Sequence, residues 1–281
     1  MKYYILFNPL AGNGHGEERA HALDGILEGE KIYCDLTKIT YDKLMSELKP
    51  EDKIVLCGGD GTLNRVINAV SAIPENEILY YPCGSGNDFY FDLTGKKNGD
   101  PIRINEYVVN LPTVTVNGKD YKFLNGIGYG IEGYCCEEGD RIRAEKPGAT
   151  IDYTGIAIKG LLFKFSPRTS TVTVDGQTKV YKKAWISPTM NGRFIGGGMM
   201  IAPGQERISD DKKLSVLVFY GTGRLKTLML FPTIFKGEHV KYTKNIMVTK
   251  GKEINVKFDM PTALQIDGET ITGVTEYSAR V

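Results

Sequence analysis

A glycine-rich loop between an apolar run and a helical pattern constrains this chain more than any other feature. Ile54–Cys57 is a short apolar run, typical of a buried parallel strand. The loop Gly58–Thr62 (GGDGT) follows, and Leu63–Val70 then places apolar side chains at helical spacing. A strand, a glycine turn and a helix N-terminus form an anion site, because backbone N–H groups and the positive end of the helix dipole face outward there. The segment predicts a phosphate-binding loop, and a plain strand-to-helix turn is the alternative.

An acidic residue lies inside this loop. Asp60 would repel a bound phosphate unless a cation lay between the two groups. We therefore expect Asp60 to contact a divalent metal ion, directly or through water, and not the phosphate itself.

Two further loops strengthen the phosphate-site hypothesis. Ile78–Tyr81 has the character of another buried strand and is followed by Pro82–Asp88 (PCGSGND), and Tyr3–Phe7 is followed by Asn8–Gly14 (NPLAGNG). Neighbouring parallel strands place their C-terminal loops at the same sheet edge, which is where open α/β sheets bind ligands. Three loops after successive strands predict one composite site.

The order of the patterns predicts two domains. Up to about Leu93 strands and helices alternate, as in a doubly wound α/β domain. After the polar segment Thr94–Pro101 the chain becomes β-rich, so we predict an α/β nucleotide-binding domain over residues 1–109 and a β-sandwich over 110–281. The prediction leaves open whether the last strand returns to the first domain. The predicted active site is the cleft between the two domains. The expected strands of the first domain are Tyr3–Phe7, Ile32–Leu36, Ile54–Cys57 and Ile78–Tyr81, and its helices are Glu17–Leu27, Asp42–Leu48, Thr62–Val70 and Asn87–Leu93.

The second domain has its own expected elements. Asn117-Gly118 and Asp175-Gly176 each separate two strand-like runs, which is a hairpin signal. Further strands are expected at Ala184–Thr189, Leu214–Tyr220, Ile246–Thr249, Ile254–Phe258 and Ala263–Ile266, with helices near Asp152–Phe163 and Leu225–Phe235. Gly128–Gly133 matches GxGxxG by letter but sits among β-rich segments, so we expect no dinucleotide role there.

Composition excludes several function classes. The 281 residues include 35 Lys plus Arg and 34 Asp plus Glu, so no global field and no basic patch draws the chain to nucleic acid or anionic lipid. No stretch approaches the ~20 apolar residues of a membrane span. Five cysteines, odd in number and without a CxxC pair, predict free thiols in a cytoplasmic protein.

Three segments, Asn8–Gly12, Gly58–Asn64 and Gly84–Phe89, resemble the N-terminal signatures of the diacylglycerol kinase catalytic family. That family includes bacterial lipid kinases and the sphingosine and ceramide kinases. The family's C-terminal landmarks also have counterparts in this chain, and these counterparts follow in the expected order. They are Gly196–Gly198 with Ala202-Pro203, then Asp210-Asp211, then Asp267–Glu269. The resemblance covers nearly the whole chain. It implies an ATP- and Mg²⁺-dependent lipid kinase of phospholipid biosynthesis, with diacylglycerol as the default substrate and phosphatidic acid as the product.

The resemblance also implies site residues. Asp267 would be the general base that takes the proton from the lipid hydroxyl, and Asp60 and Glu269 would act on the catalytic magnesium. Asp211, with the carbonyls of Ile208 and Lys213, would bind a structural magnesium. The implied ATP-binding residues are Asn8, Gly12, Thr37 (or Thr40), Gly58, Gly59, Asp60, Gly61, Thr62, Asn64, Gly84, Ser85, Gly86, Asn87 and Glu269. Two simpler interpretations stay open: a type I′ hairpin turn at Asp267-Gly268 and a solvated charged turn at Asp210-Asp211.

The chain departs from the family pattern at two places. Arg65 stands where the family commonly has Glu, and Lys212-Lys213 stands where it has Gly-Leu. These departures leave a catalytically silent lipid- or nucleotide-binding protein as one alternative. An NAD kinase is the other, because those enzymes share the Gly-Gly-Asp-Gly loop and a similar two-domain plan.

Two apolar segments bear on the lipid substrate. Leu225–Phe235 and Ile156–Phe165 are typical of core helices, and they are also the candidates for an apolar lip that reaches a lipid surface. We expect a cytoplasmic protein with peripheral, transient membrane contact and no nucleic-acid partner. A homodimer is compatible with the sequence.

Overall fold

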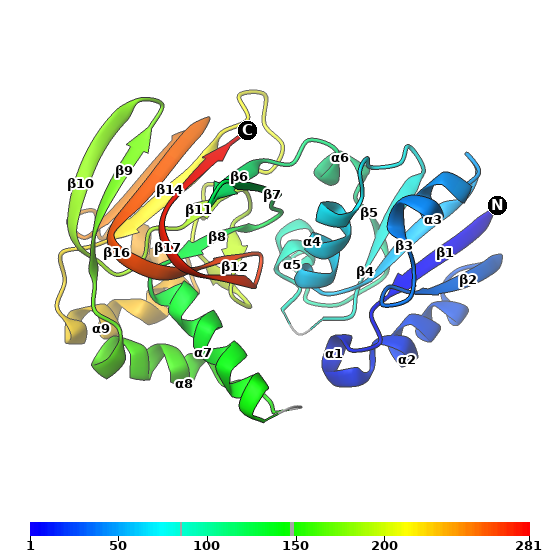
Figure 1. The fold of residues 1–281 in the computed structure, drawn as a ribbon, viewed down its shortest axis with the longest axis horizontal. Helices are drawn as coiled ribbons and strands as arrows, with labels where there is room; N and C mark the ends of the chain where they lie inside the picture. Colours follow the sequence, from blue (N-terminus) through cyan, green and yellow to red (C-terminus); the bar gives the residue numbers. More distant parts are fainter. Residues whose placement is uncertain (85, 147–148) are drawn as a thin grey trace. The chain divides into compact units, whose positions relative to one another are not determined.

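The computed structural model describes residues 1–84, 86–146 and 149–281, so the predicted site residue Ser85 lies outside the described residues. The chain forms two compact units, Met1–Leu111 and Pro112–Val281 (Figure 1). The boundary predicted from the sequence was 109/110.

The first unit is built on a five-stranded sheet. The strand order is β2 (Glu30–Asp35), β1 (Lys2–Phe7), β3 (Lys53–Gly58), β4 (Glu77–Pro82) and β5 (Ile102–Arg103). The first four strands are parallel and β5 is antiparallel to β4. The chain enters at β1, moves to β2 on one side and returns to β3 on the other. The loops after β1 and β3 therefore lie at a topological switch point, where doubly wound sheets bind ligands.

Apolar side chains cover both faces of this sheet. On one face, Ala20 and Leu23 pack with Ile5 of β1 and Val55 of β3. On the opposite face, Ile54 lines a small apolar cavity together with Val66, Ile67 and other side chains. Because side chains on both faces of the sheet are buried, the sequences of these strands are continuous runs of apolar residues. The helical segments are α1 (Ala11–Gly14), α2 (Gly16–His21), η1 (Ala22–Gly25), α3 (Tyr41–Glu47), α4 (Asp60–Ala69), α5 (Asp88–Thr94) and α6 (Asn105–Val108).

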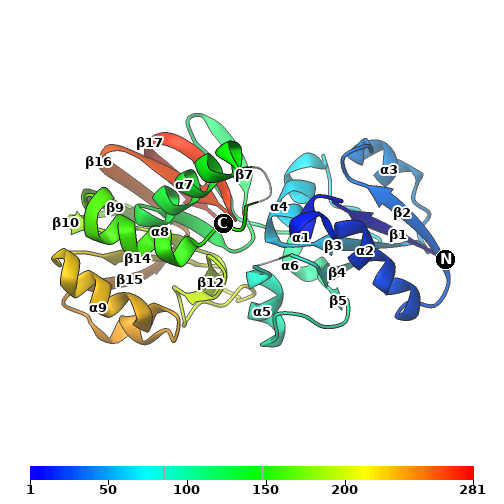
Figure 2. The same cartoon turned by 90° about the horizontal axis from the view of Figure 1, so that it is seen from below.

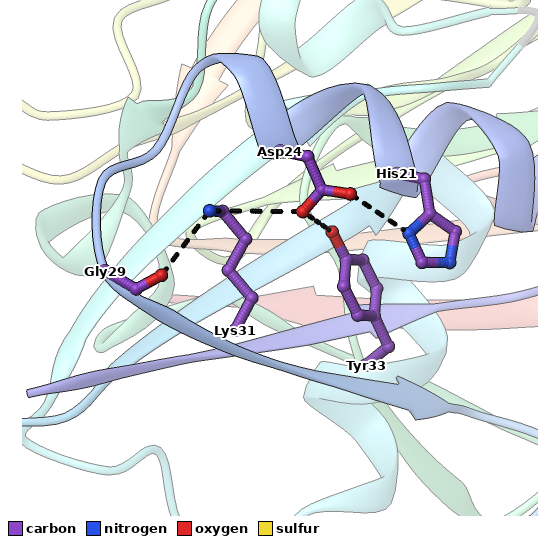
Figure 3. Close-up of polar contacts among 5 residues, drawn as sticks. All are labelled: His21, Asp24, Gly29, Lys31 and Tyr33. Atoms are coloured by element: carbon purple, nitrogen blue, oxygen red, sulfur yellow. Dashed lines mark hydrogen bonds and ion pairs between the residues drawn. The ribbon is translucent and has the colours of Figure 1, made fainter.

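A polar cluster ties the α2–η1 segment to the edge strand β2 (Figure 3). The Tyr33 hydroxyl donates to the Asp24 carboxylate at 2.7 Å, and His21 Nδ1 lies 3.4 Å from the same group. Lys31 Nζ is 3.9 Å from Asp24. The Tyr33 hydrogen bond is the main reason that the pKa of Asp24 lies below its usual value. These contacts are solvent-exposed and each is worth little; together they join α2 and η1 to β2.

The second unit is an antiparallel β structure. Its strand path is β15 (Ile246–Gly251), β14 (Leu214–Phe219), β11 (Thr189–Met190), β8 (Gly126–Tyr129), β16 (Glu253–Ile266), β17 (Glu269–Arg280), β6 (Thr113–Val116) and β7 (Lys119–Lys122). The hairpin β9 (Arg168–Val174) and β10 (Gln177–Ala184) joins through β16. A small separate hairpin pairs β12 (Phe194–Ile195) with β13 (Met199–Met200). β17 pairs with β16 and β6, so the last strand belongs to this unit and does not return to the first.

Helices cover one side of these strands. They are α7 (Ile131–Glu145), α8 (Tyr153–Lys159), the π-helical segment η2 (Gly160–Lys164), α9 (Arg224–Ile234) and η3 (Glu238–Lys241). Figures 1 and 2 show α7, α8 and α9 on the same side of the sheet. Their inner side chains surround the buried Trp185 and form a second apolar core. None of the described helices is long and apolar enough to cross a lipid bilayer.

The second unit differs from the sequence expectations in several places. The strand expected at Ala184–Thr189 does not form as one element, because β10 ends at Ala184 and β11 begins at Thr189. The strands expected at Ile254–Phe258 and Ala263–Ile266 form one long strand, β16, with irregular pairing between Lys257 and Leu264. The helix α7 was not predicted, because its two glycines and adjacent cysteines weaken the helical pattern. Gly133 has a packing reason: a Cβ there would lie 1.8 Å from the Ala263 carbonyl oxygen, so the glycine lets α7 lie directly on β16.

Candidate functional site: three glycine loops at one sheet edge

The first loop is tied to the third by an arginine. Arg19, on α2, donates from Nη1 to the Cys83 carbonyl oxygen at 2.5 Å. Gly12 has φ +59°, and a Cβ at that position would lie 2.8 Å from Arg19 Nη1 and 3.0 Å from the Cys83 oxygen. A larger residue at position 12 would therefore be strained and would displace the guanidinium. Asn8 closes the same loop, because its Oδ1 accepts the Leu10 N–H at 3.0 Å.

The second and third loops touch each other through their glycines. A Cβ on Gly84 would lie 2.3 Å from Gly59 Cα, and a Cβ on Gly59 would lie 2.9 Å from Gly84 Cα. Gly58 is constrained in a different way, since a Cβ there would lie 2.5 Å from the Cβ of Thr62. The glycines therefore allow the two loops to approach and the Thr62 side chain to fold back over the end of β3.

Asn87 holds the third loop in shape. It adopts φ +48°, which Asn tolerates better than most residues. Its Oδ1 accepts the Gly84 N–H at 3.1 Å, and its Nδ2 donates to the Gly84 carbonyl at 3.0 Å and the Lys97 carbonyl at 3.1 Å. Asn87 is buried, so these bonds satisfy a side chain that would otherwise be costly to place there.

Asp60 connects the second loop to the helix after the third. Its Oδ2 accepts the Asp88 N–H at 2.7 Å and its Oδ1 accepts the Phe89 N–H at 3.0 Å. Asp60 therefore caps the first turn of α5, while it is itself the first residue of α4. A Cβ on Gly86 would lie 3.6 Å from Asp60 Oδ2, so this predicted residue also lies beside the carboxylate. The structure brings two of the predicted motifs together through one side chain.

The remaining predicted residues of the first unit occupy different positions. Asn64 is buried on α4 and accepts hydrogen bonds from Asn68. Thr37 lies in the exposed turn after β2, where its hydroxyl donates to Asp35 at 2.7 Å. Arg65 is exposed on α4. The cation that sequence reasoning missed is Arg19: it lies outside every motif, and only the fold places it against the Cys83 carbonyl.

Asp267 forms the hairpin turn between β16 and β17, and its carboxylate is an anchor. Asp267 and Gly268 have φ of +48° and +96°, the signs that a type I′ turn requires. The carboxylate accepts three backbone N–H groups: Leu124 at 2.5 Å, Asn125 at 2.8 Å and Gly126 at 3.0 Å. The residue is buried, with 5% of its surface exposed. This geometry supports a role in holding the segment before β8. The role of Asp267 as general base stays a prediction. Glu269, two residues further along the chain, is exposed.

Glu132 is a buried acid that the sequence analysis did not single out. It lies in the first turn of α7, and 8% of its surface is exposed. Within the described part of the chain, neither carboxyl oxygen has a hydrogen-bond partner. Burial raises the pKa of Glu132 to about 8. The carboxyl group lies beside Gly128, since a Cβ there would be 2.9 Å from Glu132 Oε2.

The residues predicted to bind the structural magnesium lie around an ion pair. Lys213 Nζ lies 2.9 Å from Asp211, and this ion pair lowers the pKa of the Asp211 carboxyl. Ile208 is exposed, and Ser209 donates to Asp211 at 3.2 Å. Within residues 1–84, 86–146 and 149–281, no group of three or more His, Cys, Asp or Glu side chains is arranged to hold a metal ion. The predicted structural site uses one carboxylate and two backbone carbonyls, and the predicted catalytic pair, Asp60 and Glu269, is divided between the two units, so both magnesium assignments stay predictions.

Comparison with known proteins identifies the family. Residues 2–115 match the family model described as the diacylglycerol kinase catalytic domain. Residues 126–280 match the model described as the YegS C-terminal NAD kinase beta sandwich-like domain. The chain belongs to the diacylglycerol kinase-like family of lipid kinases. The family resemblance predicted from the motifs and the fold class, an α/β domain followed by a β-sandwich, are both confirmed.

Individual relatives agree with this assignment. The diacylglycerol kinase of Mycobacterium tuberculosis strain H37Rv is 26% identical over 272 residues, which cover 91% of this chain and 85% of that protein. A protein of Yersinia enterocolitica named "Probable lipid kinase YegS-like" is 25% identical over 79% of this chain and 73% of its own length. A crystal structure described as a diacylglycerol kinase from Bacillus anthracis strain Sterne is 20% identical, with a TM-score of 0.61 and coverage of 99% and 93%. At that identity the structural likeness supports the fold alone.

Proposed function

We propose that this protein is an ATP-dependent lipid kinase that transfers the γ-phosphoryl group of ATP to the hydroxyl group of diacylglycerol, giving phosphatidic acid. The observation that carries the proposal is the convergence of three glycine loops in the first unit. Gly12 lies against Arg19 and Cys83, and Gly59 lies against Gly84, so the loops form one cradle at the switch point of the sheet. Close backbone approach is what phosphate recognition by N–H groups requires.

A helix N-terminus and an arginine supply positive potential to the cradle. The N-terminus of α4, a helix of ten residues, begins at Asp60 in the second loop. The Arg19 guanidinium is held by the Cys83 carbonyl at the third loop. Phosphoryl transfer depends mainly on positioning and on stabilising charge at the phosphate oxygens. We propose that Arg19 and the loop N–H groups position the ATP phosphates, and that Asp60 keeps the second and third loops in register.

Diacylglycerol is the proposed acceptor. The support for diacylglycerol is the name of the Mycobacterium tuberculosis relative and the match to the diacylglycerol kinase catalytic model. Asp267 as general base and magnesium dependence stay predictions drawn from the family resemblance. Peripheral membrane association of a cytoplasmic protein is proposed on the same ground, because a lipid kinase must reach a substrate held in a bilayer.

Transfer of labelled phosphate tests the reaction. Purified protein is incubated with γ-labelled ATP, Mg²⁺ and either dioleoylglycerol in mixed micelles, ceramide or NAD. We expect label in phosphatidic acid. Label in NAD but in no lipid would assign the chain to the NAD kinases, and ATP binding with no transfer to any acceptor would indicate a silent binding protein.

A matched pair of glycine variants tests the cradle itself. Gly84→Ala places a methyl group against Gly59 Cα, whereas Gly25→Ala, in the same unit, meets nothing within 4 Å. We expect Gly84→Ala to weaken ATP binding and turnover roughly tenfold or more, since one loop must move out of position. Gly25→Ala should retain both. Equal activity of the two variants would refute the loop contact as part of the site.

A further inference from the structure

The outer surface of α8, η2 and α9 exposes large apolar side chains on a unit that already has two cores. Phe163 on η2 is 74% exposed, and Leu225 and Met229 on α9 are 73% and 77% exposed. Leu225 and Met229 are four residues apart and so share one helix face. The inner face of α9, with Leu230 and Ile234, is buried in the core around Trp185. α9 is therefore apolar on its solvent face as well as on its core face, which an ordinary surface helix is not.

The segment η2 joins α8 and α9, because it contacts both helices. α9 contacts η2 directly, and both lie on the side of the sheet that faces the viewer in Figure 2. Arg224, at the start of α9, donates from Nη1 to the carbonyls of Leu161 at 2.6 Å and Phe165 at 2.9 Å. The guanidinium thus joins the N-terminus of α9 to the end of η2. Several large apolar side chains of α8, η2 and α9 are exposed, and we call this set the apolar face. It consists of Ile158, Phe163, Leu225 and Met229, with Phe235 just beyond α9.

The two segments that carry the apolar face contain basic but no acidic residues. The segments 153–165 and 224–236 contain no Asp or Glu, although the whole chain is balanced at 35 basic and 34 acidic residues. Their lysines are exposed: Lys159, Lys164, Lys226 and Lys236. The acids nearest in the sequence are Asp152 before α8 and Glu238 after α9, and Glu138 of α7 interacts with Lys164.

We propose that the apolar face docks on the surface of an anionic phospholipid bilayer. Apolar side chains enter the boundary between headgroups and acyl chains, while lysines extend to the anionic headgroups. A protein partner or a second copy would need an apolar patch bordered by acidic groups, whereas an anionic bilayer supplies both features everywhere on its surface. The inference rests on the proposed lipid kinase function, and it specifies which surface of the second unit reaches the membrane.

Vesicle co-sedimentation without ATP tests the docking surface separately from catalysis. The probe is a vesicle of phosphatidylcholine with 30% phosphatidylglycerol, compared with pure phosphatidylcholine. We expect the wild-type protein to bind the anionic vesicles, with affinity that falls as salt rises. Leu225→Ser/Met229→Ser should weaken binding roughly tenfold or more, from the loss of two buried side chains. Lys159→Glu/Lys236→Glu should weaken it roughly tenfold and reduce its salt dependence.

A control pair lies on β10, away from these helices. Lys179→Glu/Val180→Ser changes an exposed lysine and an apolar residue that is 60% exposed, and it should bind vesicles like the wild type. The proposal is overturned if the wild type ignores anionic vesicles, if the control loses as much binding as the α9 variant, or if the Leu225/Met229 substitutions instead dissociate a dimer in solution.

Kinase assays on a short-chain diacylglycerol below its micelle concentration separate the two proposals. Variants of the apolar face that keep this activity but lose vesicle binding support the docking surface. A wild type that binds vesicles through this face and phosphorylates no lipid would refute the proposed function and leave the docking surface standing.

Discussion

Glu132 makes the stability of the second unit depend on pH in a direction opposite to that of most carboxylates. Its side chain is buried without a hydrogen-bond partner among the described residues, and desolvation raises its pKa from 4.5 to about 8. The folded protein therefore keeps this proton up to about pH 8, whereas the unfolded chain releases it near pH 4.5. Between these values the folded state binds more protons, so the free energy of unfolding falls as pH rises.

The magnitude follows from the size of the shift. Each pH unit inside the window is worth about 1.4 kcal/mol. From pH 5 to pH 8 the contribution of Glu132 should therefore reduce the free energy of unfolding by on the order of 4 kcal/mol, and the curve should flatten above pH 8. Glu132→Gln removes the titration and keeps the shape. We expect the variant to match the wild type within about 1 kcal/mol at pH 5 and to exceed it by roughly 3 kcal/mol or more at pH 8.

Urea unfolding followed by tryptophan fluorescence measures this effect. Trp185 is the only tryptophan of the chain, and it is buried in the same core as Ile131, the residue before Glu132. The signal therefore reports on the unit that contains the acid. Glu137→Gln, an exposed position on the same helix, is the matched control and should follow the wild-type curve. If the wild type and Glu132→Gln show parallel stability curves from pH 5 to pH 8, Glu132 is not a buried neutral acid and the reasoning fails.

Three further predictions concern the motif residues and the thiols. Asp267→Asn should lower the free energy of unfolding by about 2–3 kcal/mol, because an amide NH₂ would face one of the three backbone N–H donors; chemical denaturation that detects no loss would contradict the anchor. Asp60→Ala should abolish most turnover and also cost about 1 kcal/mol through the lost cap of α5; a variant with wild-type turnover would remove Asp60 from the site. All five cysteines are free in the structure, so alkylation of denatured protein without reductant should give five adducts. A bridge between Cys57 and Cys83, whose sulfurs lie 2.9 Å apart, would contradict this.

The first unit could be predicted well from the sequence because its signals are local. Its central parallel strands are buried on both faces and so appear as uninterrupted apolar runs, such as Ile54–Cys57. Each run is followed by Gly, Asn or Pro at the place where the chain must turn. The second unit was harder, because its pairings join segments far apart in the chain. β8 pairs with β16, for example, and nothing near Gly126–Tyr129 indicates the partner.

The site was predicted in part. The glycines of the three loops were found because their spacing after strands is a local pattern. Arg19 was not, since an arginine on a short surface helix has no distinguishing neighbours in the sequence, and only the packing of α2 on the sheet brings it to Cys83. Glu132 was missed for a similar reason. α7 itself was not expected, so a buried face for that residue could not be assigned.

The two motif aspartates show why residue type alone did not decide their roles. Asp60 and Asp267 were both assigned to chemistry, and in the structure each binds backbone N–H groups of a different segment: Asp60 those at the start of α5, Asp267 those before β8. A carboxylate that accepts several amides fixes loop geometry strongly, because hydrogen bonds to a charged group are stronger than neutral ones. Such an anchor is as intolerant of substitution as a catalytic base, so loss of activity in an alanine variant does not distinguish the two roles. The distinction requires stability and turnover to be measured on the same variant. An anchor loses both together, whereas a base without structural contacts loses turnover at unchanged stability. For Asp267 the three amide bonds predict a loss of stability whether or not the carboxylate also acts as a base.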